Sequence, residues 1–302
     1  MRLQECTRSM NTGRASRTAM MVTYLRALAD AGATHVPGFC DPTARVFLNA
    51  RWSRRLTKIR SQLRSGRETA SLAFARVAAD MVALRTAVID AAVRDAVAAG
   101  VRQVVILGAG LDGRAWRMKD LDGTRVFEVD HPATQTVKRH FLGALPPPIA
   151  SVTFVPIDFE REALSAVLAS ARQDDASPTC WIWEGVVMYL TRDVVRATLA
   201  GIASRSAVGS ILIVNYHTTM RHWLIRLVMR LVGEPVRSKS SPQEMAADLG
   251  AAGFEIVSDS GGEDWATRFA SGPVDLRVGR IMRVAVAKTV RQAPTRYGTA
   301  RS

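Results

Sequence analysis

Five short, mainly apolar segments dominate the middle of the chain. They cover residues 103–107, 125–129, 152–156, 180–183 and 211–216. The first of them, QVVIL, shows no alternation of polar and apolar positions, which is typical of a strand buried on both faces of a sheet. Segments with apolar positions at helical spacing separate these strands. The pattern therefore predicts a parallel, doubly wound α/β sheet with right-handed crossovers.

The residues before the first strand are predicted to be helical. Apolar positions at helical spacing indicate helices over 17–32 and 68–99, with a short helix from Asp41 to Phe47 between them. We expect residues 17–100 to form a helical cap over a site that later residues build.

The pattern changes after the fifth strand. Residues 219–232 are predicted to form an apolar, arginine-containing helix that does not lead into a strand, so we interpret the region near 217–240 as an inserted lid. After a regular helix over 242–253, two apolar segments follow at 254–259 and 280–288 without an evident crossover helix between them. They predict an antiparallel hairpin, and therefore a seven-stranded sheet with one reversed strand.

Length and composition are those of one elaborated domain. The chain has 302 residues, 48% of them apolar, and no Pro/Gly/Ser-rich linker in its middle. We expect a core over 101–288, a flexible N-terminus over 1–16 and a disordered tail over 289–302. No segment predicts a membrane span or a secretory signal, and three scattered cysteines do not suggest disulfides. These features predict a cytoplasmic protein.

The chain is strongly basic, with a formal net charge of +14. The densest stretch, residues 51–67, has seven basic residues and no acid. A solvated helix face is its simplest interpretation, and an RNA-binding surface is the alternative. The charge also fits an anionic substrate.

A glycine turn follows the first strand. Gly108, Ala109 and Gly110 would let the backbone turn sharply and let a ligand approach the amides, with a helix following. The letters GAGLDG also spell the dinucleotide pattern G-x-G-x-x-G. The second strand ends on Asp130, about 20 residues later, where a carboxylate holds a ribose in nucleotide-binding folds. The pattern leaves open a nicotinamide cofactor or S-adenosylmethionine.

Four motifs in order resemble the leucine carboxyl methyltransferase family. They are RTA…RA…DPTARVF, QVVILGAGLDGRAWR, VFEVDHP and WIWEGVVMYL, and the resemblance covers residues 17–288. It implies a class I methyltransferase fold, which is a Rossmann-like sheet with a helical cap, and S-adenosylmethionine as cofactor. It also implies O-methylation of a carboxylate or hydroxyl on a small molecule or peptide.

The resemblance assigns cofactor roles to particular residues. Arg85 matches the arginine that holds the methionine carboxylate of the cofactor, and Asp130 matches the ribose ligand. Glu184, in an apolar setting after the fourth strand, would need a cation, which the cofactor is expected to provide. The full set of predicted cofactor contacts is Arg85, Gly108, Ala109, Gly110, Asp130, Asp158, Phe159 and Glu184.

The acceptor side is less defined. His217, Tyr189 and Arg221 follow the fourth and fifth strands and are the candidates for orienting or deprotonating an acceptor. Relatives usually carry threonine where Gly113 stands and often an acid where Asn215 stands, so this chain departs from the family pattern at a helix cap and at the acceptor site. No H-E-x-x-H or C-x-x-C pattern occurs, so no metal site is predicted.

Two other functions are weighed against methyl transfer. GAGLDG alone would suit an NAD(P)-dependent oxidoreductase, but the acid after the fourth strand and the final hairpin argue against it. A basic RNA methyltransferase would use residues 51–67. The Asn/Asp-Pro-Pro-Tyr loop used for exocyclic base amines is replaced by Glu184-Gly185-Val186, so nucleic acid is not the expected acceptor.

Overall fold

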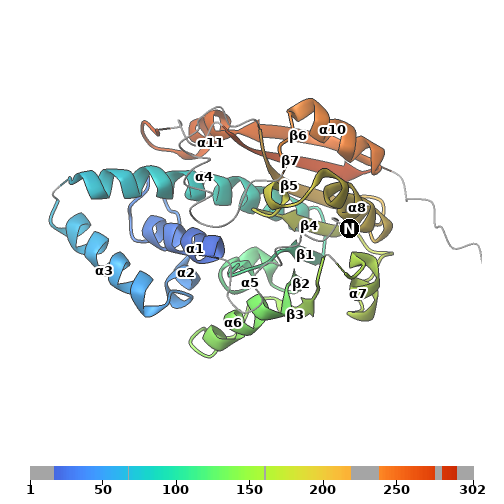
Figure 1. The fold of residues 1–302 in the computed structure, drawn as a ribbon, viewed down its shortest axis with the longest axis horizontal. Coiled ribbons are helices and arrows are strands. Elements are labelled where there is room, and N and C mark those ends of the chain that lie inside the picture. The colour runs from blue at the N-terminus through green and yellow to red at the C-terminus, as the bar shows by residue number, and fades with distance from the viewer. Residues whose placement is uncertain (1–16, 67, 160, 219–237, 276–280, 291–302) are drawn as a thin grey trace, which may run out of the picture.

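The computed structural model describes most of the chain (Figure 1). The described residues are 17–66, 68–159, 161–218, 238–275 and 281–290. The predicted flexible N-terminus, the helix proposed for 219–232 with Arg221, and all of the predicted tail beyond Val290 lie outside these residues. No helix within the described ranges is long and apolar enough to cross a membrane.

The centre of the molecule is a seven-stranded sheet. Its strands are β1 (Gln103–Leu107), β2 (Arg125–Asp130), β3 (Ser151–Pro156), β4 (Thr179–Trp183), β5 (Ile211–His217), β6 (Phe254–Gly261) and β7 (Met282–Thr289). The order is β3-β2-β1-β4-β5-β7-β6, and β7 runs antiparallel to both of its neighbours. This is the class I methyltransferase topology, so the predicted parallel sheet with one reversed strand is confirmed.

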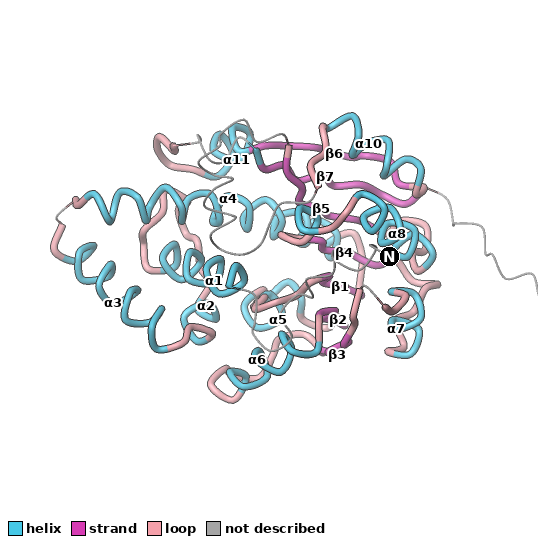
Figure 2. Tube along the Cα trace, viewed as in Figure 1, coloured by secondary structure: helices cyan, strands magenta, loops and turns pink. Residues whose placement is uncertain are grey.

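Helices cover both faces of the sheet (Figure 2). On one face lie α4 (Ala70–Ala98), α5 (Arg114–Arg117), α6 (Pro132–Leu142) and α11 (Gly262–Phe269). The N-terminal helices α1 (Arg17–Asp30), α2 (Pro42–Val46) and α3 (Ala50–Arg64) pack on α4 and α5. The other face carries α7 (Leu164–Ser170), α8 (Arg192–Ser204) and α10 (Pro242–Ala251). Two short 3-10 turns, η1 (Lys119–Leu121) and η2 (Val187–Tyr189), complete the elements.

Alternate residues of the strands pack against different helices. Ile106 and Ile182 belong to the core under α4, whereas Leu107 and Trp183 belong to the core under α8 and α10. Both faces are therefore buried, which explains why the strands lack a polar face.

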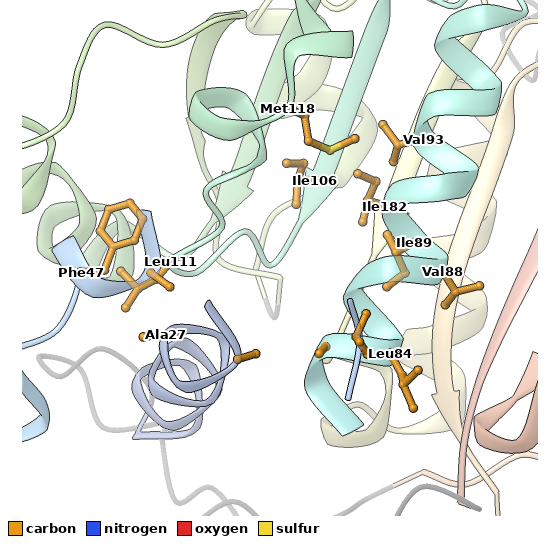
Figure 3. Close-up of a cluster of buried hydrophobic side chains, with 14 of the residues drawn as sticks. Ala27, Phe47, Leu84, Val88, Ile89, Val93, Ile106, Leu111, Met118 and Ile182 are labelled. Carbon is orange, nitrogen blue, oxygen red and sulfur yellow. The ribbon is translucent and has the colours of Figure 1, made fainter. Parts of the chain in front are cut away.

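The long helix α4 joins the N-terminal helices to the sheet. Ile89 and Val93 of α4 lie beside Ile106 and Ile182 of the sheet (Figure 3). Ala27 of α1 belongs to the same apolar core. The N-terminal helices and the sheet thus share one continuous core, and this positions α1 and α2 next to the carboxyl end of β1.

Two sequence predictions differ in detail from the structure. The strands β6 and β7 pair directly, but α11 lies between them in the chain, where no helix was predicted. This helix has only eight residues and buries one large apolar side chain, Trp265, so its repeat is too short to be recognised in the sequence. The helix after the glycine turn is also only four residues long, and its Arg114 N–H donates to the Asp112 side chain rather than facing a ligand.

The basic stretch is mainly the solvent side of α3. Leu56 and Ile59 are buried, whereas Arg51, Arg54 and Lys58 are exposed. The interpretation as a solvated helix face agrees with this burial pattern.

Candidate functional site

The predicted site residues gather where the strand order reverses. Successive parallel strands run outward from β1 in both directions, through β2 to β3 and through β4 to β5. In open α/β sheets, ligands bind in the crevice outside the carboxyl ends of the strands at this point. Gly108, Asp130 and Glu184 directly follow or end β1, β2 and β4 there.

The glycine turn brings bare backbone to the mouth of this crevice. Gly108 has φ +65° and Gly110 has φ +53°, in the left-handed region that favours glycine. A Cβ added to Gly108 would lie 2.3 Å from Cγ2 of Val186, so no side chain fits. The backbone N–H groups of Gly108 and Ala109 donate to the Val129 carbonyl at 2.8 and 3.2 Å, which fixes the turn against β2.

Asp130 braces the glycine turn. Its carboxylate accepts hydrogen bonds from the backbone N–H groups of Gly110, at 2.5 Å, and of His131, at 2.6 Å. Burial raises the pKa of Asp130, although both backbone donors oppose the shift. The His131 side chain accepts from the Ala133 N–H and so caps the start of α6.

Glu184 already has two cationic partners inside the protein. Its Oε1 lies 2.8 Å from Arg85 Nε, and its Oε2 lies 2.8 Å from Arg114 Nη2. The protein itself therefore supplies cations for this carboxylate, in addition to any that a cofactor would bring. Burial raises the pKa of Glu184, but Arg85 and Arg114 outweigh it and hold the carboxyl below its usual range, so it stays ionised. Its side chain is still 15% exposed.

Arg85 is part of this site and not a surface residue. It pairs with Glu184, whereas Glu68 and Asp80, two other acids in or near α4, contact Arg76 and His35. Among the described residues, only Nε of the Arg85 guanidinium makes a hydrogen bond. Its two Nη groups can therefore still bind the carboxylate of a ligand.

A buried ionic network that was not predicted from the sequence lies beside Glu184. Arg114 contacts Asp90, Asp112 and Glu184, and Arg117 contacts Asp90 and Asp41. Buried acids need partners, so the acids within the apolar α4 were a signal that arginines pack against this helix. The pairing itself was invisible because Arg114 and Glu184 lie 70 residues apart in sequence.

The third glycine of GAGLDG has a packing explanation. A Cβ on Gly113 would lie 1.8 Å from Oγ1 of Thr43 in α2, so α2 can pack here only against a residue without a side chain. Gly113 provides no side-chain cap to α5, as the sequence suggested. The apparent dinucleotide pattern is thus completed by helix packing and is no argument for a nicotinamide cofactor.

Asp158 and Phe159 follow β3, one strand further from β1 than Asp130. The Asp158 carbonyl accepts hydrogen bonds from the N–H groups of Arg161 and Glu162 at 2.9 and 2.8 Å. Phe159 is half-buried and packs against the apolar core on the side of α7 and α8. The pair therefore lies toward the outer end of the crevice.

Of the three acceptor candidates, His217 is the best described. It ends β5 and is 7% exposed, and its Nδ1 is buried without a hydrogen-bond partner among the described residues. Burial and the nearby Arg85 lower the pKa of His217 to about 4, so the imidazole is neutral at pH 7. Tyr189 is half-buried in η2, and Arg221 lies outside the described residues.

Asn215 is committed to the backbone. Its side-chain oxygen accepts from the Gly185 N–H at 3.3 Å, and its Nδ2 donates to the Arg283 carbonyl at 3.0 Å. A carboxylate could not make the second bond. Asn215 therefore ties the loop after β4 to β7.

The neutral state of His217 predicts a pH-dependent stability. The folded pKa of about 4 lies below the ordinary value of 6.5, so stability is complete above 6.5 and is lost as the pH falls toward 4. The loss should reach roughly 2–3 kcal/mol. His217→Gln should remove this component from urea unfolding curves measured between pH 4 and 7, with exposed His140→Gln as the control. An unchanged pH profile in His217→Gln would contradict the assignment.

Comparisons with known proteins agree with this geometry. The family described as leucine carboxyl methyltransferase matches residues 19–203, which is more than half of the chain. A relative from Frankia alni, described as a candidate S-adenosyl-L-methionine-dependent methyltransferase, is 39% identical over 197 residues. The match covers 64% of this chain and 65% of that protein. A similarly described protein from Streptomyces coelicolor is 43% identical over 130 residues, 43% of this chain and 46% of its own length. The matches thus span less than two thirds of these relatives.

Solved structures share the fold. A candidate methyltransferase from Thermobifida fusca has a TM-score of 0.56 at 18% identity, covering 88% of this chain and 94% of that one. A DUF574 family protein from Streptomyces avermitilis has a TM-score of 0.58 at 17% identity, covering 91% and 98%. The sequence motifs, the sheet order and the family match lead to one assignment: the chain belongs to the leucine carboxyl methyltransferase family.

Proposed function

We propose that the protein is an S-adenosylmethionine-dependent methyltransferase that acts on an oxygen atom. The observation that carries the proposal is Glu184, an ionised carboxylate fixed beside the glycine turn at the reversal of strand order. Family membership and the descriptions of the relatives support the same activity.

The crevice residues suit the parts of this cofactor. The glycine turn would let the cofactor approach the backbone closely, and Asp130 would hold the ribose. The Nη groups of Arg85 would bind the methionine carboxylate, and Glu184 would accept hydrogen bonds from the ammonium group. Asp158 and Phe159 would lie at the adenine end. Each role matches the charge of the group it would contact.

The acceptor chemistry follows from the absence of a strong base among these groups. When bound, S-adenosylmethionine supplies an electrophilic methyl group on a sulfonium centre. Holding an acceptor in line with it can supply on the order of 7–11 kcal/mol of the barrier. A carboxylate is already ionised at neutral pH, whereas a hydroxyl needs a base. With its pKa lowered to about 4, His217 is a weak base, which favours a carboxylate acceptor.

The class of acceptor and the cellular location are also proposed. We place the acceptor among anionic small molecules or peptides, in keeping with the net charge of +14. Cys40 and Cys180 are both unpaired, which supports a cytoplasmic location.

Calorimetry against two ligands tests the cofactor. We expect S-adenosylhomocysteine to bind and NADH not to bind. Glu184→Gln should weaken S-adenosylhomocysteine binding at least tenfold, whereas Glu255→Gln, an exposed glutamate on β6, should not change it. Binding of NADH alone, or of neither ligand, would rule out the proposed function.

The acceptor can be found with a labelled methyl group. A cell extract incubated with the enzyme and methyl-labelled S-adenosylmethionine would be analysed by mass spectrometry, before and after mild alkali. A methyl ester is hydrolysed by alkali and an ether is not. An alkali-stable product would contradict a carboxylate acceptor while leaving methyl transfer itself intact.

A further inference from the structure

Arg114 contacts three different carboxylates with its three guanidinium nitrogens. Its Nε lies 2.7 Å from Asp90 in α4, its Nη1 pairs with Asp112 in the loop after β1, and its Nη2 lies 2.8 Å from Glu184 after β4. The side chain is 2% exposed. A lysine has one nitrogen and could not span the three acids, so the site specifically requires a guanidinium.

The two arginines together fix both oxygens of Glu184. Arg85 binds Oε1 through Nε, and Arg114 binds Oε2 through Nη2. Because the two guanidinium groups belong to α4 and α5, the carboxylate can neither rotate nor withdraw without breaking one ion pair. Each oxygen keeps a second lone pair, and the partial exposure of the side chain lets a ligand reach it.

We infer that Arg114 is a positioning residue that orients Glu184 toward the amino group of the cofactor. The inference rests on the proposed function, in which Glu184 accepts hydrogen bonds from that group. Among the described residues, the hydrogen bonds of the Arg114 side chain reach the loop of the glycine turn through Asp112. Arg114 would therefore affect the binding of the amino-acid part of the cofactor and not of its nucleoside part.

The glycine turn keeps other supports when the Arg114 side chain is removed. The Arg114 backbone N–H donates to Asp112 at 2.7 Å, and Lys138 donates to the Asp112 carbonyl at 2.6 Å. Arg26 of α1 donates to the Leu111 carbonyl at 2.6 Å. A substitution of Arg114 should consequently loosen Glu184 more than it disturbs the turn.

The network extends from Arg114 to the N-terminal helices. Asp90 also binds Arg117 at 2.6 Å, and Asp41 at the start of α2 binds Arg26 at 3.0 Å. Arg117 reaches Asp41 at 3.6 Å and so joins the two pairs. Arg117 is thus a buried arginine of the same network that does not contact Glu184, which makes it a matched control.

Two ligands separate a positioning role from a general structural one. S-adenosylhomocysteine carries the amino-acid group, whereas 5′-methylthioadenosine has the nucleoside and thioether without it. In calorimetry, Arg114→Gln should weaken S-adenosylhomocysteine binding by about 10- to 100-fold, the range for a lost hydrogen bond to a charged group. Binding of 5′-methylthioadenosine should change by less than about threefold. Arg117→Gln should leave the ratio of the two affinities unchanged.

A second readout is the pH dependence of binding. Arg114 lowers the pKa of Glu184, so its removal should raise that pKa. In Arg114→Gln, S-adenosylhomocysteine binding should therefore weaken on acidification at a higher pH than in the wild type. The binding of 5′-methylthioadenosine should show no such change.

Each other outcome overturns the inference. An equal loss of both ligands would make Arg114 a support of the glycine turn, and no loss would remove it from the site. If Arg114→Gln does not fold, Arg114→Lys takes its place with the same two ligands, and failure of both to fold assigns Arg114 to the core instead. Failure of the wild type to bind S-adenosylhomocysteine would refute the proposed function, a result distinct from these.

Discussion

Replacing Lys138 with methionine is expected to lower the free energy of unfolding by about 3–5 kcal/mol, because it leaves a buried acid without its partner. Lys138 and Glu128 are each 1% exposed, and Nζ lies 2.5 Å from Oε2 of Glu128. The same Nζ donates to the Asp112 carbonyl at 2.6 Å. Lys138 thus compensates the charge of Glu128 in β2 and supports the loop after β1.

Aromatic rings line the rest of this buried site. Nζ lies 5.8, 5.1 and 5.9 Å from the ring centroids of Phe47, Trp116 and Phe154. Rings at such distances favour a cation but cannot replace a carboxylate. Methionine fills similar volume without charge, so the loss should come mainly from the orphaned Glu128 and from the Asp112 carbonyl.

The penalty should grow with pH. Burial raises the pKa of Glu128 to about 7, although Lys138 opposes the shift. An acid whose pKa is higher in the folded state than in the unfolded state destabilises the folded protein progressively as the pH rises between the two values. In Lys138→Met the opposing cation is gone, so the folded pKa rises further and the loss should be larger at pH 8 than at pH 6.

Urea unfolding at pH 6 and pH 8, followed by circular dichroism, measures the loss in the free energy of unfolding. Lys119→Met, at an exposed lysine of η1, is the control and should stay within about 0.5 kcal/mol of the wild type. The double variant Lys138→Met/Glu128→Gln should recover part of the loss, because the second change removes the unpaired charge. Equal stability of the Lys138 and Lys119 variants would contradict the buried-pair explanation.

The central strands were predictable because burial on both faces requires continuous apolar runs in the sequence. Residues of β1 and β4 pack into a helix layer on each face, so after the first residue of each strand the positions form a continuous apolar run. The acids at the ends of β2 and β4 were recognisable because a strand end in this fold lies at the ligand crevice. Local patterns therefore predicted the sheet and the positions of Asp130 and Glu184.

The charges around Glu184 could not be read from local patterns. Arg114 follows a glycine turn and looks like a solvent-facing residue of a short helix, yet its carboxylate partners come from α4 and from the end of β4. Such pairs form only after the chain has folded. The same holds for Gly113, whose missing side chain is explained by Thr43, 70 positions earlier in the sequence.

Gly108→Ala is expected to destabilise the protein by about 2–5 kcal/mol and to weaken cofactor binding. Two costs add at this position. A left-handed backbone costs a residue with a Cβ roughly 1–2 kcal/mol, and overpacking against a neighbour typically costs about 1–3 kcal/mol. The neighbour is Val186, whose Cγ2 would lie 2.3 Å from the new Cβ.

A substitution at nearby Gly185 measures the cost of the left-handed backbone without a clash. Gly185 has φ +69°, close to the +65° of Gly108, but a Cβ there meets nothing within 4 Å. Gly185→Ala should therefore show the backbone cost alone, about 1–2 kcal/mol. In Gly108→Ala/Val186→Ala the clash is relieved, so the free energy of unfolding should rise above that of Gly108→Ala despite the smaller side chain at 186.

Calorimetry with S-adenosylhomocysteine then relates this geometry to the site. Gly108→Ala should bind at least tenfold more weakly than Gly185→Ala, because the displaced turn moves the backbone amides and the bond from Gly110 to Asp130. The double variant should recover part of the affinity, since relieving the clash lets the turn return. If Gly108→Ala and Gly185→Ala bound equally well, the close approach of the turn to Val186 would have no part in shaping the cofactor crevice.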